Sequence, residues 1–244
     1  MITERYRFAD KTVAVTSLYP AVHEYCKAYR TDGTPDFAVT VTQDDIAFER
    51  QKTVSEYLCE KRRVPDFPDP ELETTAVYRK IAEKLPDYGS FVFHGSAVAA
   101  DGQGFLFTAK SGTGKSTHTA LWRKLLGERA VMVNDDKPVL QVSDSGVTVY
   151  GTPYNGKHRL GTDIAVPLKA LCILTRGAEN SIERISAQQA YPMLLQQVYR
   201  PQNPLQMMKT LKLIDGLAAR TALYQLACNM ELSAAETAYQ AMKG

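Results

Sequence analysis

The stretch Ala109–Ser116, AKSGTGKS, has the residue types and the spacing of a phosphate-binding loop. Gly112 and Gly114 let the chain turn its amide N–H groups inward, and Lys115 can reach the outer phosphates. The Ser116 hydroxyl can ligate the magnesium ion that the phosphates carry. The segment therefore predicts binding of a nucleoside triphosphate together with Mg²⁺. The predicted nucleotide-binding residues are Ser111, Gly112, Thr113, Gly114, Lys115, Ser116 and Thr117.

A second polar group, Asn134–Asp136, follows the apolar run Val131–Val133 shortly after the loop. One carboxylate at such a strand end can hold magnesium, while another accepts the proton of an attacking hydroxyl. Side chains of neighbouring strand residues point to opposite faces, but the twist at a strand end can bring both toward one site. We place Asp135 with Ser116 at the metal and Asp136 at the proton transfer. The sequence leaves the reverse division open, and a plain strand-end turn also favours these residue types.

Two histidines lie close to these segments in the sequence. His94 is on the apolar segment that precedes the loop strand, where it could orient an aspartate, contact the transferred phosphoryl group or serve the structure alone. His118 falls in the first turn after the loop, where a positive helix end disfavours its charged form. The candidate catalytic residues are Asp136, Asp135, His94 and Lys115.

Three further cations are candidates for contacts with phosphates. Lys157 lies in the polar loop Gly151–His158, which could close over the phosphates, although a surface turn explains the same sequence. Arg176 and Arg200 are weaker candidates, because most arginines lie on the protein surface.

The predicted loop is flanked by a strand and a helix. The apolar run Gly104–Thr108 precedes it, and the segment from Ser116 to Gly127 carries apolar residues at helical spacing. The free amides and the positive dipole end of that helix add to the charge of Lys115. Trp122 lies on the apolar face of the helix, so we expect it in the core rather than beneath an adenine ring.

The chain is predicted to have three parts. Residues 1–63 form a small β-rich region of short alternating strands. Residues 64–90 form a proline-containing linker and a helix that starts at Asp69. Residues 91–244 form the nucleotide-binding domain, with a sheet-rich centre and a mostly helical C-terminal third. Helix starts in that third are predicted at Ser186, Asn203 and Ser233.

Composition excludes several functional classes. A chain of 244 residues can form one large domain or a large domain with a small appendage. A formal net charge of +2 with mixed signs gives no electrostatic footprint for nucleic acid or an anionic membrane. The four cysteines lack zinc-ligand spacing, the charged first residues do not resemble a signal peptide, and no apolar run has the length of a membrane span. We therefore expect a cytoplasmic protein without nucleic-acid or membrane partners.

The combination of His94-Gly95, a turn, the strand Gly104–Thr108, the loop and the Asp135-Asp136 pair resembles the catalytic domain of HPr kinase/phosphorylase. It is more distantly similar to the nucleotide core of phosphoenolpyruvate carboxykinase. The similarity is good over residues 91–140 and extends to about residue 240 only in outline. It implies an α/β fold, in which a mixed β-sheet flanked by helices surrounds the P-loop.

The resemblance also implies roles for individual residues. Lys115 and Ser116 would hold phosphates and magnesium, and the two aspartates would serve metal and act as the base. His94 would contact the carboxylate of the base. The family usually carries glutamate directly after the loop serine, where this chain has Thr117.

We therefore expect an ATP- and Mg²⁺-dependent kinase that transfers the γ-phosphoryl group to an acceptor hydroxyl. The acceptor stays open among HPr, a serine of another protein or peptide, and a small hydroxyl compound. The alternative is a non-catalytic nucleotide-binding module with a regulatory or assembly role. ATP hydrolysis coupled to movement is a weaker hypothesis, because no arginine-finger pattern is recognisable. The sequence also leaves homo-oligomerisation open.

Overall fold

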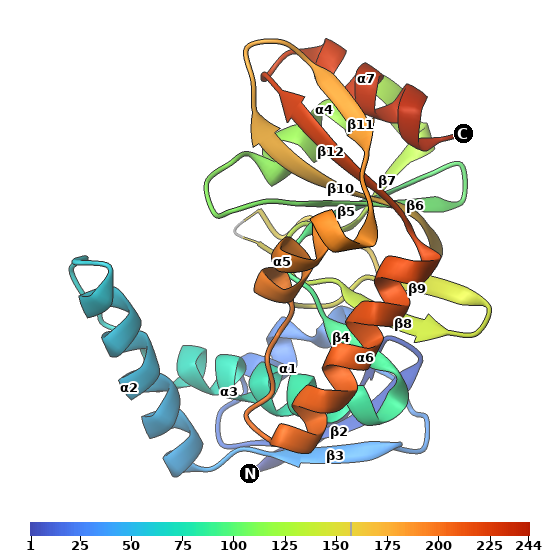
Figure 1. Cartoon of the computed structure of the whole chain (residues 1–244). Helices are drawn as coiled ribbons and strands as arrows, with labels where there is room; N and C mark the ends of the chain where they lie inside the picture. The colour runs from blue at the N-terminus through green and yellow to red at the C-terminus, as the bar shows by residue number, and fades with distance from the viewer. Residues whose placement is uncertain (157) are drawn as a thin grey trace. The chain divides into compact units, whose positions relative to one another are not determined.

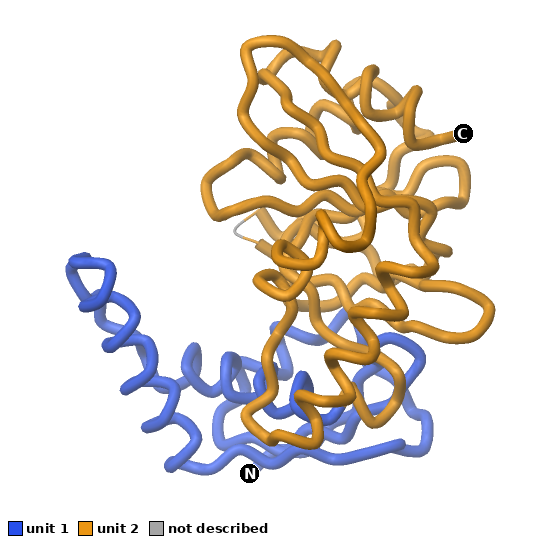
Figure 2. Tube along the Cα trace, in the orientation of Figure 1, with its two compact units in different colours: residues 1–84 blue, residues 85–244 orange. Residues whose placement is uncertain are grey.

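The structure is a computed structural model that describes residues 1–156 and 158–244. It divides into two compact units, Met1–Lys84 and Leu85–Gly244, shown in Figure 2. We describe each unit by itself. Lys157, a candidate phosphate contact, lies outside the described residues.

The first unit contains a small sheet, as the alternating pattern of its sequence predicts. Strands β1 and β2 pair in antiparallel orientation, and β3 lies parallel to β2. Val13 and Val15 of β2 are fully buried on the face of the sheet that α3 contacts. The elements of this unit are β1 (Ile2–Phe8), β2 (Lys11–Ser17), α1 (Ala21–Tyr25), η1 (Lys27–Tyr29), β3 (Phe37–Thr40), α2 (Gln43–Cys59) and α3 (Asp69–Lys84).

Helix α2 is a departure from the expected short strands in this region. Thr42 caps the helix in a capping box, in which its backbone N–H donates to Asp45 Oδ2 at 2.9 Å. The buried residues of α2 are Ile46 and Glu49, so the helix has little apolar periodicity to reveal it. Instead, Arg79 of α3 binds the carboxylates of Glu49 and Asp45, which ties the two helices together.

Helix α3 confirms the prediction of a helix that starts near Asp69. It runs to Lys84 and buries an apolar stripe against the small sheet and α1. Its Glu73 is fully buried, and its carboxylate accepts hydrogen bonds from the backbone N–H groups of Leu18 and Tyr19 at 2.5 and 3.0 Å. These bonds satisfy a buried charge that would otherwise oppose folding.

The second unit is built on a mixed sheet flanked by helices (Figure 1), which confirms the expected fold class. The neighbouring strands follow the order β4-β8-β9-β10-β6-β5-β7, and β12 joins β10 to β11. The strands are β4 (Ser90–Val92), β5 (Ser96–Ala100), β6 (Gln103–Thr108), β7 (Ala130–Asn134), β8 (Val139–Ser143), β9 (Gly146–Tyr150), β10 (Ala165–Arg176), β11 (Ser181–Arg184) and β12 (Ala222–Cys228).

Strand β10 connects the parts of this sheet. Its first residues pair antiparallel with β9, and its later residues lie parallel to both β6 and β12. The order therefore places the strand that precedes the phosphate-binding loop beside β10, and β12 on the other side of β10.

Helices cover both faces of the sheet, because alternate residues of the buried strands point in opposite directions. On β6, Phe105 and Phe107 pack with α4 and α7, while Leu106 packs with α5 and α6. Trp122 of α4 is fully buried against both phenylalanine rings, as expected for a core residue. The helical elements are η2 (Leu85–Tyr88), α4 (Lys115–Leu126), η3 (Gly127–Arg129), α5 (Ala187–Gln197), α6 (Pro204–Arg220) and α7 (Leu232–Met242).

Two of the predicted helix starts are confirmed and one is wrong. Ser186 caps α5 in a capping box with Gln189, and the Asn203 side chain accepts hydrogen bonds from the first amides of α6. Helix α7 begins at Leu232, with Glu231 rather than Ser233 at the cap. The hydroxyl of Ser233 instead accepts a hydrogen bond from Asn180 Nδ2 at 3.0 Å.

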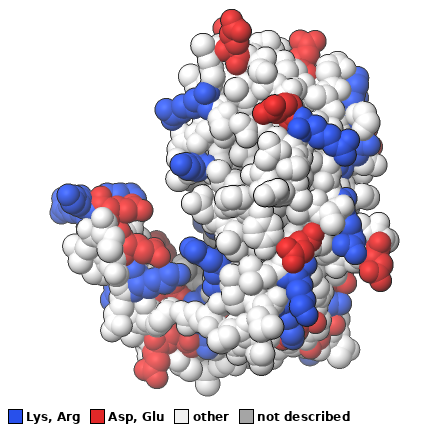
Figure 3. Space-filling view, viewed as in Figure 1, with Lys and Arg blue, Asp and Glu red and all other residues white. Residues whose placement is uncertain are grey.

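The surface shown in Figure 3 carries Lys and Arg side chains scattered among Asp and Glu side chains. This mixture agrees with the small net charge of the chain. Across the described residues, the helices are all too short or too polar to traverse a lipid bilayer.

Candidate functional site

The predicted phosphate-binding loop joins the buried strand β6 to the start of α4. Gly112 and Gly114 have φ angles of +76° and +120°, which glycine adopts without the strain that a side chain would cause. A Cβ atom on Gly112 would meet no atom within 4 Å, so backbone conformation rather than space requires glycine there. Because the first amides of a helix have no partner within it, α4 presents free N–H groups at this point.

Lys115 is half-buried and reaches back across the loop. Its Nζ donates to the carbonyl oxygen of Ala109 at 3.4 Å, so the side chain joins the two ends of the loop. Burial lowers the pKa of Lys115, and the negative charge of Asp136 partly opposes that effect. Lys115 and Asp136 therefore interact electrostatically.

Asp135 is buried at the end of β7. Its Oδ1 accepts a hydrogen bond from the backbone N–H of Gly156 at 2.6 Å. Burial raises the pKa of Asp135, although that hydrogen bond favours the charged form. Asp135 and Ser116 line the same cavity, of about 550 Å³, which we call the Ser116–Asp135 cavity. Thr117 of the loop segment also lines it.

Asp136 and His94 form a pair, as the resemblance implied. His94 Nε2 lies 3.3 Å from Asp136 Oδ1, and Lys137 Nζ lies 3.1 Å from both carboxylate oxygens. Burial acts to raise the pKa of Asp136, but the hydrogen bond from His94 and the charge of Lys137 outweigh it, so that the pKa is lowered. Sequence reasoning missed Lys137, although its place directly after Asp136 was a signal.

Asn134 builds the turn that separates the two carboxylates. Its Oδ1 accepts hydrogen bonds from the backbone N–H groups of Asp136 and Lys137 at 2.8 and 2.7 Å. Its Nδ2 donates to the carbonyl oxygen and the hydroxyl of Thr152 at 3.2 and 3.0 Å. The fully buried Asn134 thus fixes the strand-end turn and connects it to the loop that starts at Gly151. The hydrogen bonds of Asn134 confirm the turn interpretation of this segment.

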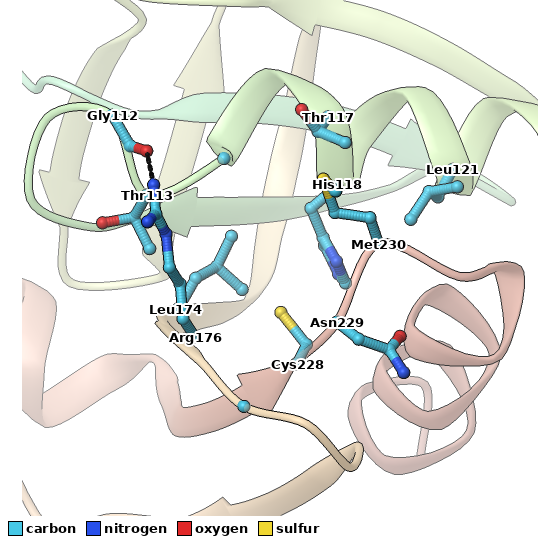
Figure 4. A pocket seen from close by; sticks show the side chains of 12 residues that line it. Gly112, Thr113, Thr117, His118, Leu121, Leu174, Arg176, Cys228, Asn229 and Met230 are labelled. Atoms are coloured by element: carbon cyan, nitrogen blue, oxygen red, sulfur yellow. Dashed lines mark hydrogen bonds between the residues drawn. The ribbon is translucent and has the colours of Figure 1, made fainter.

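A second cavity, of about 480 Å³, borders the other side of the loop (Figure 4). We call it the loop-side cavity. Arg176, at the end of β10, donates from Nη2 to the carbonyl oxygen of Gly112 at 2.7 Å. No local pattern indicated the residues that follow β12, because strand pairing alone brings them to the loop. The lining residues are Gly112, Thr113, Gly114, Thr117, His118, Leu121, Leu174, Arg176, Gly177, Cys228, Asn229 and Met230.

His118 is a structural residue that also lines the loop-side cavity. It is buried, and its Nε2 accepts a hydrogen bond from Trp122 Nε1 at 3.2 Å. Burial lowers the pKa of His118 to about 4, so the ring is neutral at physiological pH. Arg200, by contrast, is exposed in the connection between α5 and α6 and lines neither of the two cavities.

The donor set around Ser116 fits magnesium that arrives with a nucleotide. Within the described residues, no cluster of three or more His, Cys, Asp and Glu side chains could hold a metal ion. Magnesium in phosphate sites keeps several waters and needs only one or two protein ligands besides the phosphates. A hydroxyl and a carboxylate, as in Ser116 and Asp135, are the oxygen donors that it prefers.

The fold and the site define a mixed α/β protein with a glycine-rich loop between a central strand and a helix, beside a pair of aspartates. Residues 59–235 match the family model described as SynChlorMet cassette protein ScmC, and the chain belongs to this family. The HPr(Ser) kinase/phosphatase from Coxiella burnetii is among the similar solved structures. It is 10% identical, with a TM-score of 0.32, over 63% of this chain and 99% of that chain. No curated protein matches the chain.

Proposed function

We propose that this chain is an ATP- and Mg²⁺-dependent phosphotransferase that moves the γ-phosphoryl group of ATP to an acceptor hydroxyl. One observation carries the proposal. Ser116 of the phosphate-binding loop shares a cavity with Asp135, while the next residue, Asp136, is held by His94 and interacts with Lys115. Positioning and charge stabilisation at a phosphoryl group require these groups in one place.

The triphosphate would lie against the loop amides and Lys115, and the nucleoside would extend into the loop-side cavity. That cavity begins at the loop glycines and continues between apolar side chains that suit a planar base, including Leu121, Leu174 and Met230. The Arg176 guanidinium, which donates to the Gly112 carbonyl oxygen, would contact a phosphate.

Ser116 and Asp135 would hold magnesium, which neutralises charge on the bridged phosphates when it is bound. Asp135 suits this role because it is buried and already oriented by the backbone N–H of Gly156. A bound cation would also favour the charged form of Asp135, against the effect of burial.

Asp136 would accept the proton of the acceptor hydroxyl. Its lowered pKa keeps it ionised, and His94 and Lys137 hold its orientation. The acceptor oxygen forms a bond to the γ-phosphorus, the bond from that phosphorus to the oxygen of the leaving group breaks, and ADP departs. Lys115 stabilises the charge that develops on the transferred group.

The test compares wild-type protein with Asp136→Asn in a screen of labelled ATP against peptides, HPr-like proteins and small alcohols. We expect Asp136→Asn to bind a fluorescent ATP analogue while transfer falls about 10²–10⁴-fold, the usual contribution of a general base. Asp144→Asn, in the exposed turn between β8 and β9, is the matched control. Equal transfer by Asp136→Asn refutes the base assignment. Nucleotide binding by wild-type protein without transfer to any acceptor favours a regulatory module.

A further inference from the structure

Helix α4 presents different faces to the two cavities. His118 and Leu121 line the loop-side cavity, and Thr117 lies between the two faces and borders both cavities. Residues at the helical spacing of three and four, namely Ser116, Thr119, Ala120 and Arg123, line the Ser116–Asp135 cavity. Both cavities therefore reach the phosphate-binding end of the same helix, as expected where two substrates meet at one phosphoryl group.

The Ser116–Asp135 cavity differs from the loop-side cavity in its charge. Asp135 and Ser116 line it close to the loop, and Arg123, two helical turns further along α4, also lines it. His158, Met132 and Leu160 complete the wall. A volume of about 550 Å³ lies within the range of pockets for small molecules.

Arg123 lacks the partners that a cation in such a position normally has. Its Nε is buried and has no hydrogen-bond partner among the described residues. A buried donor without a partner costs free energy, and the cost is larger when the group is charged. An anionic group of a ligand in the cavity could pair with the guanidinium of Arg123, which carries its charge on the cavity wall.

We propose that the Ser116–Asp135 cavity binds the phosphoryl acceptor and that this acceptor carries a carboxylate, which pairs with Arg123. The acceptor hydroxyl then lies at the end of the cavity that Ser116 and Asp135 line. This inference rests on the proposed phosphotransferase function. The carboxylate belongs either to a free hydroxy acid or to an acidic residue near a serine in a peptide, and the experiment separates these sources.

The first experiment needs no transfer activity. In the ¹H–¹⁵N NMR spectrum, the Nε–H signal of Arg123 is assigned by its absence in Arg123→Lys. The probes are N-acetylserine with N-acetylserinamide, and an acetylated Ser-Glu-Gly peptide amide with its Ser-Gln-Gly counterpart. We expect the acid of one pair to shift this signal at a concentration about tenfold lower than its amide, as one additional charged hydrogen bond allows. The pair that responds identifies the source of the carboxylate. A signal that no acid shifts, or that acids and amides shift alike, overturns the proposal.

The second experiment measures transfer. Arg123→Gln should raise the KM for the acid acceptor about tenfold or more, with a smaller effect on kcat and little effect on the amide acceptor. Lys124→Gln removes the same charge from the neighbouring exposed residue, which lines neither cavity, and should leave both values unchanged. Equal effects of the two variants on the acid acceptor contradict the proposed role of Arg123.

The two experiments keep the two proposals apart. If the acids shift the Arg123 signal but wild-type protein transfers no phosphate, the carboxylate site stands and the phosphotransferase function fails. If transfer occurs without preference for acids and the signal does not move, the function stands and the carboxylate site fails.

Discussion

Asp135 and Asp136 are neighbours in the sequence, yet their surroundings shift their pKa values in opposite directions. Burial raises the pKa of Asp135. Burial also acts to raise the pKa of Asp136, but the hydrogen bond from His94 and the charge of Lys137 more than offset it. Two carboxyl groups with separated pKa values can take different roles in one reaction. Among the groups around Asp136, His94 lowers its pKa the most.

Replacement of His94 by glutamine should therefore raise the pKa of Asp136. Glutamine cannot form the imidazole hydrogen bond that most lowers the pKa of Asp136, so the charged carboxylate loses part of its stabilisation. A ¹³C NMR titration of the Asp136 carboxyl carbon measures the change directly. His23→Gln, in the first unit, is the control that should leave the titration unchanged. A midpoint that does not move in His94→Gln would show that Lys137, and not His94, lowers the pKa of Asp136.

The buried carboxylate of Asp135 lowers the folding stability of the protein, and its proposed role in binding magnesium explains why it is present. A carboxyl group whose pKa is raised in the folded state opposes folding above that pKa, and this cost disappears as the pH falls through it. Asp135→Asn should therefore raise the melting temperature at neutral pH.

The same variant should weaken Mg²⁺-dependent nucleotide binding about 10–100-fold, if the carboxylate orients the metal or its water. Differential scanning fluorimetry with and without Mg-ATP measures both effects. At pH values well below the folded pKa of Asp135, the difference in melting temperature should shrink. A lower melting temperature for Asp135→Asn at neutral pH would contradict the assigned cost.

Among the elements of the second unit, the loop between β6 and α4 contains two glycines with positive φ angles, Gly112 and Gly114. Gly102, which lies outside the loop, has nearly the same φ angle as Gly112 and serves as a comparison. Gly112 and Gly102 have φ angles of +76° and +77°, and a Cβ on either would meet no atom within 4 Å. Alanine at either position should cost roughly 1–2 kcal/mol of stability through backbone strain. Only Gly112→Ala should also reduce ATP binding, because Gly102 lies in the turn between β5 and β6. Equal ATP affinity of the two variants in isothermal titration calorimetry would exclude the loop as the phosphate site.

The elements that sequence predicted are those with strong local signals. The strand, loop and helix around Gly112 follow from residue spacing within one segment. Helix α2 was not predicted because its apolar periodicity is weak. One of its buried residues is the acidic Glu49, which pairs with Arg79. The capping box at Thr42 was the available signal.

The candidate site was predictable only in part for a related reason. Residue type and position made Asp136 and His94 candidates, the resemblance implied that they touch, and their contact is present. The loop-side cavity required knowledge of the sheet order. Arg176 lies opposite Cys228 across parallel strands more than fifty residues apart, and no local pattern encodes that neighbourhood. The sequence likewise could not show that the Nε of Arg123 is buried without a hydrogen-bond partner, because that depends on the packing around it.

Across the second unit, nucleotide binding should slow hydrogen exchange in several segments that are distant in sequence. Hydrogen exchange with Mg-ATP should become slower in residues 109–121, 174–177 and 228–230, since these segments line the loop and its cavity. The turn at residues 143–147, in the same unit, should exchange as before and serves as an internal control. Protection confined to residues 109–121 would mean that the nucleoside does not enter the loop-side cavity.

Strand β10 sets the register of both halves of its sheet. Its first residues pair with β9, and its later residues pair with β6 and β12. Insertion of a single residue within β10 would turn every following side chain to the opposite face. Arg176 would then leave the loop carbonyl that it contacts, and Leu171 and Cys172 would exchange between opposite cores. The length of β10 is therefore as strongly constrained as the identity of any residue in the site. The turn between β8 and β9, by contrast, can lengthen without displacing either cavity.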